Sequence, residues 1–184
     1  MALPNYGEMT LFDHSWYGRV LVERCDKLTK KKHWREGYQQ INECERWLTD
    51  DRQVLLKFWV HISKSEQKKR FRETLDDPLL RWKITKEYRR HHRQYDRWVE
   101  AVEEMLAKTD SPHAPWTVVE GSDLRWARVR FLRTIVNGVE AELSRRRARA
   151  VEKTDGRQGK LLVEKPPGAK RGAARVRSAE VAHA

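Results

Sequence analysis

The sequence predicts an α/β fold in which parallel strands and helices form a three-layer arrangement. Short segments rich in β-branched and aromatic residues alternate along the chain with longer segments of helical spacing. The order strand, helix, strand, helix is typical of a parallel sheet, because parallel neighbours need long crossover connections. Eight tryptophans in 184 residues supply enough large apolar side chains for one domain with a core.

The first predicted strand is the apolar run 9–12, which we expect to be buried on both faces. Asp13 follows where this strand ends, and Ser15 can cap a helix that begins there. The carboxyl end of a parallel strand is where open α/β sheets place their functional groups. Asp13 is therefore a candidate site residue, although an equally weighted interpretation makes it a simple helix cap.

The next elements follow from periodicity and composition. Apolar residues at helical spacing predict a helix over 30–50, with Thr29 as its cap. The nearly continuous apolar run 54–62 predicts a strand that helices cover on both faces. The remaining predicted elements are a capping box at 63–66 that opens a helix ending before Pro78, a long helix over 86–108 capped by Thr85, a strand over 116–119 and a helix over 124–145.

The charge is concentrated at the end of the chain. Residues 145–184 contain twelve Lys or Arg and four Asp or Glu, which is eight of the net charge of +12. Periodicity fails from Arg146 onward, so we predict a domain over 1–145 and a disordered basic tail over 146–184. No apolar run is long enough to span a membrane, and no signal peptide or cysteine framework is apparent, so we expect a cytoplasmic protein.

Four separate motifs occur in the order found in one family. They are the segment 11–24 with Phe-Asp-His-Ser-Trp-Tyr-Gly-Arg, the segment 54–70 with Lys-Phe-Trp and His-Ile-Ser-Lys, Asp77-Pro78 with Arg81-Trp82-Lys83-Ile84, and Ser-Pro-His-Ala-Pro-Trp at 111–116. Together they resemble the type 2 polyphosphate kinases, and the flanks of Gly18 favour the polyphosphate:AMP phosphotransferase branch. The resemblance implies a P-loop kinase-like fold with a helical lid, and phosphoryl transfer between polyphosphate and AMP or ADP with Mg²⁺.

The resemblance also assigns roles to residues. Asp13 matches the Walker B acid, which holds magnesium, and Arg19 would contact phosphate; these two are the predicted catalytic residues. The predicted substrate-binding residues are His14, Arg70, Arg81 and Lys83.

Two departures from the family pattern stand out. His14 occupies the place of an arginine, which replaces a permanent forked charge by an imidazole largely neutral at pH 7. No Gly-rich Walker A loop precedes residue 11, and Gly156-Arg157-Gln158-Gly159-Lys160 lacks the spacing of one. We therefore expect the chain to match the C-terminal two-thirds of the catalytic domain, as a truncated or split form that needs a Walker A segment.

Several alternatives stay open at this point. The chain could be a catalytically inactive module that binds polyanions by charge, or a non-functional remnant. Its partners could be a second copy of itself or a complementing Walker A-containing chain, and we expect neither a membrane nor a specific nucleic-acid partner. His91 and His92 are predicted to face different sides of a helix without a carboxylate at ligand spacing, so we expect no metal site there.

Overall fold

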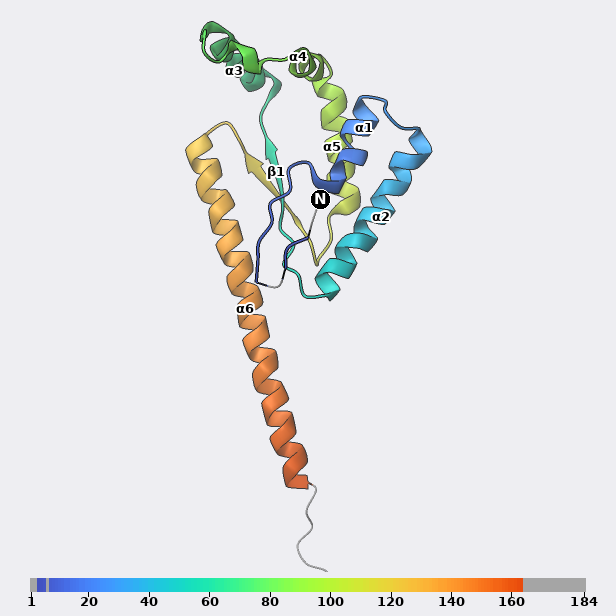
Figure 1. Cartoon of the computed structure of the whole chain (residues 1–184), viewed down its shortest axis with the longest axis vertical. Coiled ribbons are helices and arrows are strands. Elements are labelled where there is room, and N and C mark those ends of the chain that lie inside the picture. Colours follow the sequence, from blue (N-terminus) through green and yellow to red (C-terminus); the bar gives the residue numbers. More distant parts are fainter. Residues whose placement is uncertain (1–2, 6, 164–184) are drawn as a thin grey trace, which may run out of the picture. The chain divides into compact units, whose positions relative to one another are not determined.

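The computed structural model describes residues 3–5 and 7–163, with the backbone alone for 153–163. The chain divides between Glu142 and Leu143 into two units, which are treated separately below. The elements, in chain order, are η1 (Ser15–Arg19), α1 (Val22–Cys25), α2 (Lys31–Asp50), β1 (Lys57–His61), α3 (Lys64–Asp76), η2 (Arg81–Lys83), α4 (Lys86–Arg93), α5 (Tyr95–Thr109), β2 (Trp116–Glu120) and α6 (Leu124–Val163) (Figure 1).

The sheet of the first unit confirms the predicted α/β class with parallel strands. Strands β1 and β2 pair in parallel, with Lys57 opposite Trp116 and His61 opposite Glu120. Strand β1 lies inside the predicted range 54–62, and β2 covers the predicted range 116–119 and ends one residue beyond it. The prediction that helices cover the whole of β1 is wrong in part, because Val60 is 54% exposed.

The main core lies on one face of this sheet. Side chains alternate along a strand, so Lys57 and Trp59 face the core together while Phe58 points to the opposite face. There the Phe58 ring packs on Phe131 of α6, with ring centroids 4.2 Å apart. The buried core cluster comes from η1, α1 and the link between them, and from α2 and α5. It consists of Tyr17, Val20, Leu21, Cys25, Trp34, Tyr38, Ile41, Ala101, Val102 and Met105.

Two of the predicted helix caps are confirmed. Ser63 accepts a hydrogen bond from the backbone N–H of Glu66, and Thr85 accepts one from Tyr88. Thr29 does not cap α2, whose N-cap is Lys30. The long helix predicted over 86–108 is two helices, which meet at Gln94.

The predicted strand over 9–12 is wrong. These residues form an irregular segment in which Met9 and Leu11 are exposed. A strand needs a hydrogen-bonded neighbour, and within the described residues β1 and β2 pair only with each other.

The end of the chain also differs from expectation. Helix α6 extends to Val163, so residues 146–163 are helical where a disordered tail was predicted. The rest of that predicted tail, 164–184, lies outside the described residues. Over the part of the chain that the structure covers, every helix is too short or too polar to cross a membrane.

Candidate functional site

The segment that carries Asp13 turns sharply before η1. His14 and Ser15 have φ angles of 55° and 46°, in the left-handed region that side chains other than glycine rarely adopt. His14 is the N-cap of η1 and makes no side-chain capping bond, so the predicted cap at Ser15 is wrong. The Asp13 carboxylate is 94% exposed and lies 3.2 Å from Nδ1 of His14. The turn therefore presents the acid and the imidazole side by side to solvent.

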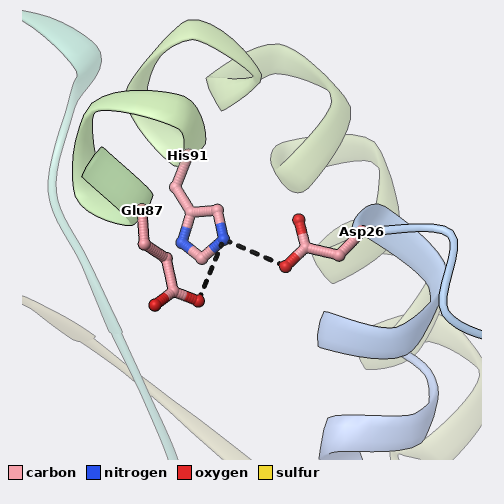
Figure 2. A group of neighbouring side chains, drawn as sticks. All are labelled: Asp26, Glu87 and His91. Carbon is pink, nitrogen blue, oxygen red and sulfur yellow. Dashed lines mark hydrogen bonds and ion pairs between the residues drawn. The ribbon is translucent and has the colours of Figure 1, made fainter. Parts of the chain in front are cut away.

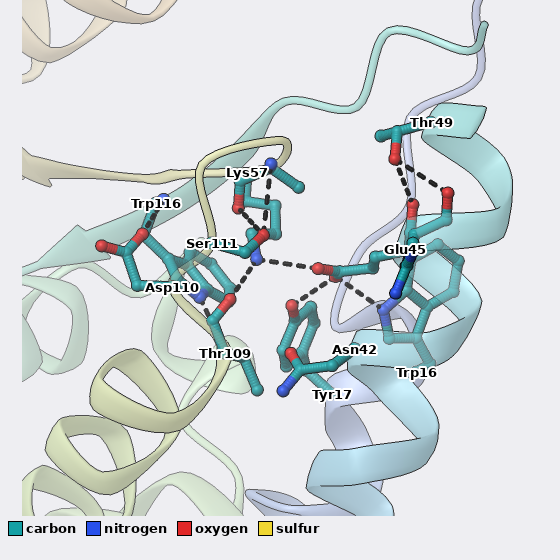
Figure 3. Close-up of polar contacts among 12 residues, drawn as sticks. Trp16, Tyr17, Asn42, Glu45, Thr49, Lys57, Thr109, Asp110, Ser111 and Trp116 are labelled. Carbon is teal, nitrogen blue, oxygen red and sulfur yellow. Dashed lines mark hydrogen bonds and ion pairs between the residues drawn. The ribbon is translucent and has the colours of Figure 1, made fainter.

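A buried polar network fixes the residues that follow this turn (Figure 3). Trp16 donates its indole N–H to Oε1 of Glu45 over 3.2 Å, and the Tyr17 hydroxyl donates to the same oxygen. Glu45 projects from α2, and its other oxygen accepts a hydrogen bond from Nζ of Lys57 in β1 over 2.8 Å. Lys57 also donates to the backbone carbonyl of Thr109 over 2.6 Å. One carboxylate thus joins η1, α2 and β1.

Burial sets the electrostatics of this network. Burial lowers the pKa of Lys57, although the hydrogen bond and the charge of Glu45 act in the opposite direction. Burial also raises the pKa of Tyr17, and Glu45 raises it further because a phenolate beside a carboxylate would be repelled. The side chains of Lys57 and Glu45 are 3% and 0% exposed, so the ion pair is closed to solvent. It can position η1 but cannot contact a substrate.

The sequence offered a signal for Glu45 that the predictions did not use. Tyr38, Ile41, Glu45 and Leu48 share one helical face at spacings of three and four. An acid in the middle of an apolar stripe indicates a buried partner. Neither Glu45 nor Lys57 was among the predicted site residues.

Arg19 lies over the surface of α2. Its guanidinium donates to Oε1 of Gln40 over 2.5 Å. A Cβ atom at Gly37 would approach Cδ of Arg19 to 2.9 Å, so the glycine makes room for the arginine side chain. Arg19 remains exposed, and the contact with Gln40 can yield to an anion.

Arg70 has a different environment from the other predicted residues. Its Nε donates to Glu66 over 2.8 Å, and its Nη2 donates to the carbonyl oxygens of Gly121 and Ser122 over 2.6 and 3.1 Å. These acceptors tie α3 to the loop after β2. The guanidinium is therefore engaged by the protein itself.

Arg81 and Lys83 form the exposed side of η2, between α3 and α4. The Lys83 ammonium lies 5.9 Å from the ring centroid of Trp82, which is itself exposed. Both cations are therefore open to a polyanion. The hydrogen bonds and ion pairs found among the described residues bring Asp13 and His14 together, but they do not link either residue to Arg19, Arg70 or the η2 cations.

A basic surface pocket lies on α2 beside Lys108 and His113. It has a volume of about 480 Å³ and is lined by Arg35, Tyr38, Gln39, Asn42, Glu43, Arg46, Lys108 and His113. None of the six predicted site residues lines it.

Comparison with known proteins identifies the family. The family model described as Polyphosphate kinase 2 matches residues 1–147. A Pseudomonas syringae protein named polyphosphate:AMP phosphotransferase is 41% identical over 143 residues, which are 78% of this chain and 29% of the relative. A Meiothermus ruber protein named AMP/ADP-polyphosphate phosphotransferase is 39% identical over 126 residues, which are 68% of this chain and 47% of the relative.

Solved structures agree with the sequence comparison. A crystal structure from Pseudomonas aeruginosa PA01, of a protein assigned to polyphosphate kinase 2, has a TM-score of 0.68 and 42% identity and covers 71% of this chain. Polyphosphate Kinase 2 from Arthrobacter aurescens TC1 has a TM-score of 0.66 and 26% identity. The chain spans 28% and 52% of these two structures. These matches confirm the predicted P-loop kinase-like class, and the chain belongs to the polyphosphate kinase 2 family.

Proposed function

We propose that this chain supplies part of the active site of a phosphotransferase that moves phosphoryl groups between polyphosphate and AMP or ADP. The observation that carries the proposal is the family match over residues 1–147, which contains the exposed Asp13 before η1, the exposed Arg19 at the end of η1 and the cations of η2. Relatives at about 40% identity are named for transfer between polyphosphate and these nucleotides. The basic charge of the chain suits both substrates, which are polyanions.

Asp13 is the residue that would hold magnesium. Carboxylate oxygens are ligands that Mg²⁺ prefers, and a fully exposed single carboxylate leaves room for an ion that keeps most of its waters. When bound, the ion would neutralise phosphate charge during transfer. Arg19 would contact a phosphate oxygen by leaving Gln40, and His14 would do so as a hydrogen-bond donor beside Asp13.

The cations of η2 would cover the polyanion. Arg81 and Lys83 lie on a short connection between helices α3 and α4, and Trp82 beside them offers an exposed apolar surface. Such a segment can close over bound phosphates and exclude water. Arg70 would support this cover indirectly, because its bonds to Gly121 and Ser122 fix α3.

A Walker A segment would complete the site. The sequence contains no Gly-rich phosphate loop of the required spacing, and β1 and β2 expose Val60 and Val118 on opposite faces of their sheet. We propose that a segment with such a loop, supplied by another chain, packs beside this sheet. The match of 28–29% of the length of Pseudomonas relatives agrees with a partial domain.

The test combines activity with complementation. The purified chain is mixed with polyphosphate, Mg²⁺ and AMP or ADP, alone and with a second polypeptide that carries the Walker A portion of a relative. We expect new nucleotide product in the mixture, and Asp13→Asn to reduce it at least 100-fold, while the matched exposed change Asp51→Asn has little effect. Polyphosphate binding without product under every condition would contradict the proposal and favour an inactive polyanion-binding module.

A further inference from the structure

We propose that Asp26, Glu87 and His91 form a binding site for a divalent ion of the zinc type, which fastens α4 to the end of α1 (Figure 2). Asp26 is the C-cap residue of α1, and the other two residues project from α4. Glu87 and His91 are one helical turn apart, so both reach the same point. The expectation that His91 has no carboxylate at ligand spacing is therefore wrong.

The distances between the three side chains suit one ion. Nε2 of His91 lies 3.3 Å from Oδ2 of Asp26 and 3.9 Å from Oε1 of Glu87, and one ligand atom from each residue lies within 4.8 Å of the others. Zinc binds nitrogen and oxygen at ~2.0–2.2 Å, so two ligands of a tetrahedral site are roughly 3.3 Å apart. Small rotations of exposed Glu87 would bring the set to that spacing. Water would take the fourth position, as in zinc sites with three protein ligands.

A second observation indicates that a partner belongs at this place. The Asp26 side chain is 8% exposed, and its Oδ1 atom is buried without a hydrogen-bond partner among the described residues. A buried carboxylate oxygen without a partner is costly. A cation bound to this carboxylate would offset that cost by placing a positive charge beside Oδ1.

Arg90 currently provides the positive charge near these acids. Its Nη2 lies 2.8 Å from Oδ2 of Asp26 and 3.7 Å from Oε1 of Glu87. The Arg90 side chain is 46% exposed, so it can turn to solvent when an ion binds. Arg90 and the metal ion would then compete for the same carboxylates. Removal of Arg90 should therefore strengthen metal binding, which a network of ion pairs without a metal site would not show.

The neighbouring histidine is a built-in control. Nδ1 of His92 lies 2.6 Å from Oε1 of Gln67, and its ring packs on Phe71 of α3. His92 therefore lies on another side of α4. The His91 ring instead contacts the Trp98 ring, with centroids 4.7 Å apart, so Trp98 fluorescence can report binding.

The test titrates Zn²⁺ into the metal-free full chain and follows heat, Trp fluorescence and the melting temperature, without nucleotide. We expect one ion per chain and a higher melting temperature with zinc. Glu87→Gln, an exposed change that spares the core, and His91→Gln should each weaken binding at least 10-fold, whereas His92→Gln should not. Arg90→Gln should tighten binding several-fold because it removes the competing cation.

Two results would overturn the site. One is zinc affinity that stays the same in both Glu87→Gln and His91→Gln. The other is binding that disappears in Cys44→Ser, since that change removes an exposed thiol that binds zinc by itself. Catalysis plays no part in these measurements, so their outcome is independent of the proposed phosphotransferase activity.

Discussion

Lys57 and Glu45 form a buried ion pair, with Nζ and Oε2 2.8 Å apart and almost no solvent access on either side. Two charges removed from water repay the cost of desolvation only when both partners are present. The pair holds together the elements that carry the Asp13 turn, because Glu45 also accepts hydrogen bonds from Trp16 and Tyr17. Its loss should therefore affect the fold before it affects any chemistry.

Removal of one partner is expected to be more damaging than removal of both. Glu45→Gln should lower the free energy of unfolding by about 3–5 kcal/mol, because it leaves the Lys57 charge buried without a counter-charge. The double change Glu45→Leu with Lys57→Met should cost less than Glu45→Gln alone. Urea titration followed by Trp fluorescence measures both, with Glu43→Gln on the exposed side of α2 as the control. A loss below about 1 kcal/mol for Glu45→Gln would contradict a closed ion pair.

The stability of the chain should fall in alkali because of Tyr17. Its pKa in the folded state is raised above the ordinary value of 10.0, so the unfolded chain releases this proton first. The stabilisation that comes from protonated Tyr17 is complete below the unfolded-state pKa of 10.0. It is lost as the pH rises above that value, by about 1.4 kcal/mol at pH 11. Tyr17→Phe has no proton to lose, so the difference in unfolding free energy between the two proteins should shrink by this amount between pH 8 and pH 11. Tyr38 and Lys57 titrate in both proteins, and parallel curves would show that Tyr17 ionises normally.

Variants of Arg70 can distinguish a structural role from a role in substrate binding. Arg70→Gln should cost about 1–3 kcal/mol of stability, because the Glu66 carboxylate and the carbonyls of Gly121 and Ser122 lose a charged donor. The matched change Lys69→Gln removes an exposed charge from the same helix and should have an effect within about 0.5 kcal/mol. Polyphosphate binding by the two variants, measured where both are folded, should fall equally. A much larger loss for Arg70→Gln would make that guanidinium a direct ligand.

The sequence predicts those parts of the fold that depend on local chemistry. Ser63 and Thr85 cap their helices as expected, since the bonds they make reach only three residues along the chain. The run 9–12 has the composition of a buried strand, but a strand also depends on a distant neighbour that composition does not reveal. The break at Gln94 was missed because the apolar stripe continues through it.

The candidate site shows the same division. The motifs name Asp13, Arg19 and the η2 cations as candidates, because each belongs to a contiguous stretch of sequence. They could not show that Arg70 bonds to carbonyls some fifty residues away, or that Lys57 meets Glu45. Glu87 and His91 were predictable from their spacing of four, whereas their approach to Asp26 depends on how α4 packs against α1.

Because β1 and β2 pair in parallel, residues 62–115 form one long connection whose two ends are held together by the sheet. The chain leaves the sheet at His61 and returns at Trp116. The hydrogen bond from Lys57 to the Thr109 carbonyl also ties the end of this connection to β1. Lengthening a closed loop is inexpensive, at roughly 0.6 kcal/mol for each doubling. We therefore expect the region from α3 to α4 to tolerate changes in length while the strands keep their register.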